Sequence, residues 1–306
     1  MEPVTSADLA LRGLTSRQIA RLCSQGKLSR IARGLYLEQP GNHVSSHRAL
    51  AATRTRPLAL ESAALVHGLP LMTLPRKVQT IQPGDGRSRS KTHERILSAP
   101  LPDHHLTVIA GQWVTTRART VVDLARLRGL DEALVPWDAA RWAARRDHAL
   151  EIFDDATDEV LASLTNRKGV ARARQARGLS SAFSESPAET RSLLSIRRLG
   201  LPEPVQQFEV VDGRGNRLGF GDFGWPDRGV LGEYDGKDKY TTLARPGETP
   251  ADVIRREKRR QESMEAQGWI VARWGAEELA DPTRLRDRIE AAFEVARRRG
   301  ARPLVA

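Results

Sequence analysis

Three acidic residues stand at positions that strands usually fill with apolar side chains, in the segment LGFGDFGWPDRGVLGEYDGKDKY. Asp222 lies near the end of one strand-like run, and Glu233 and Asp235 lie near the end of the next. A short turn at residues 225–228 joins the runs, so the strand ends lie side by side and the three carboxylates are expected to converge. Clustered carboxylates need a proton or a cation between them, and a set of oxygen ligands suits Mg²⁺ or Mn²⁺.

The same acids have a second interpretation that involves no metal. In it they form a solvated hairpin end, whose charges are neutralised by Lys237, Lys239 and nearby arginines. Spacing alone supports a metal site and a solvated hairpin end equally well, so both interpretations stay open.

The elements that must position these acids follow the order helix, three strands, helix, strand, helix. A serine-rich linker, GLSSAFSES, precedes them, and Ser186 then caps a helix with Pro187 at its first position and Glu189 at its third. A new domain therefore begins after the linker. Its later elements are expected as strands at 205–211, 217–223 and 229–234, a helix at 250–267, a strand at WIVARW and a helix at 282–299.

This order of elements and the placement of the acids resemble the PD-(D/E)XK nuclease superfamily, and within it the Vsr-like endonuclease domains, over about residues 184–299. The resemblance rests on SESPAETRSLL, GFGDFGWPDRGVLGEYDGKDKY and REKRRQESMEAQGWIVARW. It implies a mixed sheet flanked by helices and metal-dependent hydrolysis of a phosphodiester. It also implies Asp222 and Glu233 as the motif acids, Glu189 as an additional acid, and a Mg²⁺ or Mn²⁺ site formed by Glu189, Asp222, Glu233 and Asp235.

One position departs from the motif of that superfamily. The lysine expected two residues after Glu233 is replaced by Asp235. Lys239 or Lys237 would then stabilise charge or position the attacking water, and both count with the acids as catalytic candidates. This departure puts the hydrolytic activity in doubt, although the clustered acids still favour metal binding.

The helix around REKRRQESMEAQGW brings several basic residues near the same face in this fold. Arg255 and Lys258 are the members expected nearest to the scissile DNA backbone, and the alternative is a solvated helix face. The resulting hypothesis is a DNA-binding protein with a Mg²⁺-dependent endonuclease domain. The alternative is a non-enzymatic antitoxin or transcriptional repressor that keeps a degenerate nuclease fold as a binding scaffold.

A second informative stretch, LTSRQIARLCSQGKLSRIARGLYL, lies near the N-terminus. Thr15 and Gln18 predict a capping box for a short helix that Gly26 closes, and residues 27–37 predict a small hairpin. With a preceding helix at about residues 6–12 this makes a winged helix-turn-helix, which inserts its second helix into the major groove. The expected DNA contacts are Ser16, Arg17, Arg21, Ser24 and Gln25 on the helix and Lys27, Arg30 and Arg33 on the wing.

The same stretch, and especially its ending RIARGLYL, resembles the N-terminal winged-helix domain of AbiEi-type antitoxins, the DNA-binding halves of type IV toxin–antitoxin systems. The resemblance covers about the first forty residues and implies autorepression of an operon. It also implies a cognate toxin as a partner besides double-stranded DNA. The alternative for this unit is a winged helix that contacts protein, with its arginines solvating the surface.

The composition agrees with a nucleic-acid partner. The chain has 306 residues and a formal net charge of +11, and a basic protein binds polyanions because counterions are released. Cys23 is the single cysteine, so no disulfide framework or cysteine zinc site is expected, and the seven histidines, including His104 and His105, predict no metal site. Without a span-length apolar run or a leader pattern, the expected location is cytoplasmic and no membrane contact is expected.

We expect an α+β to α/β chain of four parts. They are a winged helix-turn-helix at 1–40, an α+β connector without a catalytic constellation at 45–148, a helical linker at 149–183, and a PD-(D/E)XK nuclease-like domain at 184–306. The basic stretch at 84–91 is expected as a turn-rich loop between strands of the connector.

Overall fold

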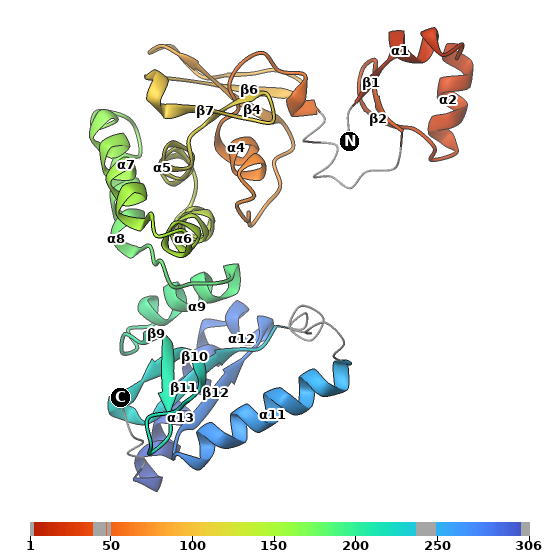
Figure 1. The fold of residues 1–306 in the computed structure, drawn as a ribbon. Helices are drawn as coiled ribbons and strands as arrows, with labels where there is room; N and C mark the ends of the chain where they lie inside the picture. Colours follow the sequence, from red (N-terminus) through yellow and green to blue (C-terminus); the bar gives the residue numbers. More distant parts are fainter. Residues whose placement is uncertain (1–2, 39–46, 48–49, 237–248, 301–306) are drawn as a thin grey trace. The chain divides into compact units, whose positions relative to one another are not determined.

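The computed structural model describes residues 3–38, 47, 50–236 and 249–300. The chain forms two compact units, residues 1–182 and 183–306, whose helices and strands are drawn in Figure 1. Within the described residues, no helix combines the length and the apolar composition that crossing a bilayer requires.

The first unit begins with a helix-turn-helix followed by a hairpin (Figure 1). Its elements are β1 (Val4–Thr5), α1 (Ser6–Leu11), α2 (Ser16–Ser24), β2 (Ser29–Ala32) and β3 (Leu35–Leu37). Thr5 and Thr15 each form a capping box with the side chain three residues later, as predicted for α2. The strands form an antiparallel sheet in the order β1-β3-β2, and Gly34 makes the hairpin turn with a φ of 75°. A small core consists of Leu9, Ile19, Leu28 and Tyr36.

A helix and two small sheets follow. The elements are α4 (Leu60–Val66), β4 (Val78–Pro83), β5 (Arg89–Ser90), β6 (Glu94–Ala99), β7 (Leu106–Ile109) and β8 (Gln112–Thr115). β6 is the central strand of one sheet, parallel to β4 and antiparallel to β5, and β7 pairs with β8. The sequence predicts neither β5 nor β6, and the expected loop at 84–91 is wrong where β5 forms. The sequence does not predict β6 because the strand begins with an acid, Glu94. In the structure Glu94 is buried, and its carboxylate accepts a hydrogen bond from Thr80.

Four helices complete the first unit: α5 (Arg117–Leu127), α6 (Leu130–Arg146), α7 (Leu150–Ser163) and α8 (Val170–Leu179). The sequence predicts a helical linker at 149–183. In the structure, the helices α7 and α8 of this segment pack against α5. Both helices are polar in composition, but helical spacing brings a few small and aliphatic side chains to one face as a narrow apolar stripe. The buried apolar residues of this segment include Val160, Leu161, Leu164, Val170, Ala173 and Ala176.

The second unit is a mixed four-stranded sheet flanked by helices (Figure 1). Its elements are α9 (Pro187–Arg198), β9 (Val205–Val211), β10 (Arg217–Trp225), the 3₁₀ turn η2 (Pro226–Arg228), β11 (Val230–Tyr234), α11 (Pro250–Ala266), β12 (Ile270–Trp274), α12 (Ala276–Ala280) and α13 (Pro282–Arg299). The strand order is β12-β11-β10-β9, with β12 parallel to β11 and the other neighbours antiparallel. Among the described residues of this unit, the short helix α12 is the element that the sequence does not predict.

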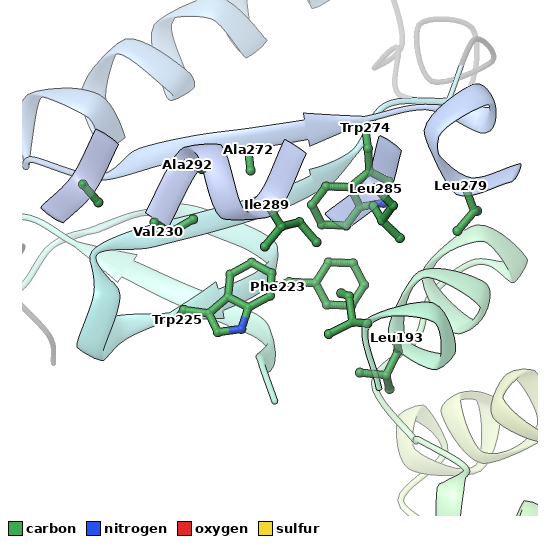
Figure 2. Close-up of a cluster of buried hydrophobic side chains, with 12 residues drawn as sticks. Leu193, Phe223, Trp225, Val230, Ala272, Trp274, Leu279, Leu285, Ile289 and Ala292 are labelled. Atoms are coloured by element: carbon green, nitrogen blue, oxygen red, sulfur yellow. The ribbon is translucent and has the colours of Figure 1, made fainter. Parts of the chain in front are cut away.

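Alternation along the strands gives this sheet two buried faces. On one face, shown in Figure 2, side chains of α9, α12 and α13 pack against Phe223, Trp225 and Trp274. On the other face, Leu231 and Val210 of the sheet pack with Met264 of α11. Gly232 permits the dense packing of the first face, because a Cβ there would lie 2.6 Å from the Trp274 ring. The sheet is therefore held between α11 and the helices of the opposite face.

Candidate functional site

A row of polar residues crosses the four strands of the second sheet. The parallel register pairs Glu233 of β11 with Arg273 of β12. Asp222 of β10 directly precedes Phe223, which pairs with Gly232 of β11, and Gln207 of β9 lies between Gln206 and Phe208, which pair with Phe223 and Gly221. We call these four residues the polar row, and it contains two of the predicted motif acids.

Glu233 is the buried centre of the polar row, with 4% of its surface exposed. One carboxylate oxygen accepts a hydrogen bond from Nη2 of Arg260 at 2.7 Å. The other accepts from Nε and Nη2 of Arg273 at 3.0 and 2.9 Å. Burial acts to raise the pKa of Glu233, but the two guanidinium groups outweigh burial and hold the pKa below its ordinary value. Glu233 is therefore an anion with two cationic partners.

Glu189 of α9 lies close enough to Asp222 of the polar row for the charges of the two carboxyl groups to interact. Glu189 is buried near the start of α9 and accepts hydrogen bonds from the backbone N–H of Glu185 at 2.9 Å, from Ser186 Oγ at 2.8 Å and from Gln207 Nε2 at 3.2 Å. Burial, and next the charge of Asp222, raise the pKa of Glu189 to about 7. Asp222 itself accepts the backbone N–H of Tyr234 at 2.8 Å.

The four acids predicted as metal ligands are not gathered at one point. Asp235 is exposed beyond the end of β11, because that strand ends at Tyr234 and its alternation does not continue. Within the described residues, the acids do not form a group of three with ligand atoms within 4.8 Å of one another. A divalent cation at Glu233 would also face two arginines, so the residues present do not fit a metal there. Lys237 and Lys239 lie outside the described residues.

A group of side chains in the first unit does meet that distance criterion: His104, His105 and Glu159. Nε2 of His105 lies 2.7 Å from Glu159, and its Nδ1 lies 2.9 Å from Nη1 of the buried Arg119. Because arginine only donates, Nδ1 accepts the hydrogen bond and Nε2 carries the proton that it donates to Glu159. A metal on Nε2 would force a proton onto Nδ1 against the guanidinium. This cluster, which the sequence did not indicate, is therefore a hydrogen-bonded chain rather than a metal centre.

The predicted DNA-binding residues of the first unit are all exposed. The helix α2 exposes Ser16, Arg17, Arg21, Ser24 and Gln25, and the segment that follows it exposes Lys27, Arg30 and Arg33. The opposite face of α2 is fixed by the buried side chain of Ile19. Residues 13–37 contain five basic and no acidic residues. A basic helix face beside a basic hairpin can contact phosphates and base edges of a duplex.

The basic residues predicted on α11 have local acidic neighbours. Nη2 of Arg255 donates to Asp252 at 2.8 Å, and Nζ of Lys258 lies 3.8 Å from Glu262. Both basic side chains are exposed. Such exposed pairs are weak and leave the cations accessible to another anion.

The first unit thus begins with two short helices followed by a hairpin, and this part of the chain has a match among known families. Residues 1–39 match the model of a family described as transcriptional regulator, AbiEi antitoxin.

The chain is also similar to two proteins of Mycobacterium tuberculosis. They are the uncharacterized proteins MT2308 of strain CDC 1551 / Oshkosh and Rv2248 of strain ATCC 25618 / H37Rv, each 28% identical over 193 residues. The matches cover 63% of this chain and 66% of each relative, so the chain spans just under two thirds of their length. Among solved structures, the Rv2827c protein of Mycobacterium tuberculosis is similar over 58% of this chain and 76% of that chain, with 18% identity and a TM-score of 0.34.

Proposed function

We propose that this protein is a DNA-binding transcriptional regulator of the AbiEi antitoxin kind. The observation that carries the proposal is the match of residues 1–39 to that family, which coincides with the helix-turn-helix. The five basic and no acidic residues of 13–37 support it, since they give this face a positive charge. In this proposal the protein represses transcription by occupying double-stranded DNA at its own operon.

The roles of the exposed residues follow from their positions. The helix α2 enters the major groove, where Arg17, Arg21 and Gln25 contact base edges and neighbouring phosphates. Arg30 and Arg33 on the hairpin contact the phosphate backbone, which positions the helix without reading sequence. Arginine suits both roles because its planar guanidinium donates two parallel hydrogen bonds.

The test is binding of the full chain to a labelled duplex taken from upstream of its own gene. Fluorescence anisotropy compares this duplex with a scrambled duplex of the same composition and with the single strand. We expect preference for the native duplex by at least about 100-fold at physiological salt, and affinity that falls steeply as salt rises. Equal binding to all three nucleic acids would contradict the proposed regulator.

A cognate toxin is the protein partner that this proposal implies. The experiment is co-purification of the tagged chain with the product of the gene adjacent to its own. Recovery of a stable complex, together with relief of toxicity on co-expression, is the expected result. A neighbouring product that neither binds nor is neutralised would remove the antitoxin part of the proposal and leave the DNA-binding part standing.

A nuclease activity of the second unit is the second candidate function. The specific observation in its favour is the pair Glu189 and Asp222, two close carboxyl groups with a raised pKa on Glu189. We derive no metal-dependent step, because the partners of Glu233 do not fit a cation there. Incubation of DNA with Mg²⁺ or Mn²⁺ tests this candidate: cleavage that Asp222→Ala abolishes would support it, and intact DNA with both metals would count against it.

A further inference from the structure

We infer that Glu233 is not a metal ligand in this protein but the shared anionic partner of Arg260 and Arg273, which take the place of a cation in the polar row. This inference concerns the second unit and goes beyond the proposed DNA binding of the first. It replaces the expectation, drawn from the sequence, that the acids of this sheet hold Mg²⁺ together.

The contacts of Glu233 carry the first step. Its two oxygens are divided between the arginines, Oε1 to Arg260 at 2.7 Å and Oε2 to Arg273 through two nitrogens at 3.0 and 2.9 Å. Glu233 is 4% exposed, so its carboxylate is largely shielded from water. Charge-assisted and partly bidentate contacts of this kind are the strongest hydrogen bonds that a carboxylate makes in proteins.

Both arginines are held in place by further contacts. Nη1 of Arg260 donates to the backbone oxygen of Phe220 at 2.8 Å, and Nη1 of Arg273 donates to Oε1 of Gln261 at 2.6 Å. The stem of Arg260 lies against Gly219, where a Cβ would stand 3.1 Å from Cδ of the arginine. A glycine in β10 thus gives the room that Arg260 needs to reach Glu233.

The charge of Glu233 is already compensated. Its carboxylate faces the positive charges of Arg260 at 2.7 Å and Arg273 at 2.9 Å. Glu233 therefore has its cationic partners without a metal. A divalent cation at Glu233 would bring two further positive charges beside guanidinium groups that do not lose their protons. The arginines instead tie α11, through Arg260, and β12, through Arg273, to the central strand β11.

The test counts Mn²⁺ ions bound to the full-length protein by electron paramagnetic resonance of the free ion. Three proteins are compared: the natural chain, Glu233→Gln, and the matched control Glu209→Gln, which removes an exposed acid of the same sheet that pairs with Arg217. We expect the same Mn²⁺ binding in all three proteins. A saturable site that is present in the natural chain and the control, but lost in Glu233→Gln, would overturn the inference.

Glu233→Gln leaves two arginines without their carboxylate and could unfold the protein. Circular dichroism therefore checks that this variant is folded. If it is unfolded, the charge-balanced double variant Glu233→Gln/Arg260→Met takes its place in the same titration. The melting temperature of the natural chain supplies a second readout. We expect no change in Tm with Mn²⁺, whereas a rise on the order of 5 °C that the double variant lacks would place the ion on Glu233 and contradict the inference.

Discussion

The basic residues of α2 and its hairpin differ from those of the polar row in what surrounds them. In residues 13–37 the guanidinium and ammonium groups are exposed and no acid lies in the segment. In the second unit Arg260 and Arg273 are directed at one buried carboxylate. Unpaired surface charge attracts an external polyanion, whereas paired buried charge holds the fold together. The number of arginines in a stretch therefore says less about function than the partners of each one.

The largest expected effect is on the stability of the second unit, in which the arginines are paired. Glu233→Gln removes the common partner of Arg260 and Arg273, and breaking a buried ion pair costs about 3–5 kcal/mol of unfolding free energy. Urea unfolding, followed by the fluorescence of the buried Trp269 and Trp274, measures the loss. The exposed Glu209→Gln is the control and should change stability by less than about 0.5 kcal/mol. Equal losses in the two variants would mean that the ion pairs of Glu233 do not stabilise the unit.

A second effect concerns the pH dependence of the stability of the second unit. The pKa of Glu189 is raised from 4.5 to about 7 in the folded chain, so the folded state binds more protons than the unfolded state between these values. The stabilisation by this proton is complete below about pH 4.5 and is lost as the pH rises through 7. Glu233, with its lowered pKa, acts in the opposite sense, because its ion pairs are lost as the pH falls.

Glu189→Gln should therefore flatten the fall in stability of the second unit between pH 5.5 and 8.5. The expected difference from the natural chain is on the order of 2 kcal/mol across that window. Urea midpoints at three pH values measure it, with Glu203→Gln as an exposed control. Parallel pH profiles for the natural chain and Glu189→Gln would show that the carboxyl group of Glu189 does not titrate in this range.

A smaller effect concerns the hairpin arginines of the first unit. Arg30→Ala/Arg33→Ala removes two proposed phosphate contacts, so the slope of log affinity against log salt should become shallower by about 2. Affinity should fall about tenfold at physiological salt, equally for native and scrambled duplexes. Anisotropy titrations at four salt concentrations give both numbers. An unchanged slope would place the hairpin away from the DNA.

The sequence predicts local structure in this chain better than it predicts contacts. The capping boxes, the hairpin near Gly34 and the strands of the second sheet follow from spacing over a few residues. The partners of Glu233 do not, because Arg260 is 27 residues away and lies in a run with several other basic residues. Which of them turns inward depends on how α11 is rotated over the sheet. The one signal available was that Arg260 stands one helical turn before the buried Met264.

The predicted convergence of three carboxylates depends on strand alternation, and alternation ends with the strand. β11 stops at Tyr234, so Asp235 lies exposed beyond the strand, whereas Glu233 within it is buried. The spacing from Ser186 predicts Glu189 at the third position of its helix, which the structure confirms, but the raised pKa of Glu189 depends on burial and on Asp222, which spacing does not show. The metal ligand set therefore stays a prediction from resemblance, and the geometry argues against Glu233 as a member.

The most direct test of the central claim compares two charge-matched double variants in binding to the duplex from upstream of the gene. Arg17→Ala/Arg21→Ala removes two exposed arginines of α2, and Arg297→Ala/Arg298→Ala removes two exposed arginines of α13 that pair with Glu294. We predict that the first variant loses affinity by at least about tenfold at equal salt, while the second stays within about twofold. Equal losses in both variants, or full affinity in the first, would contradict the assignment of DNA binding to α2.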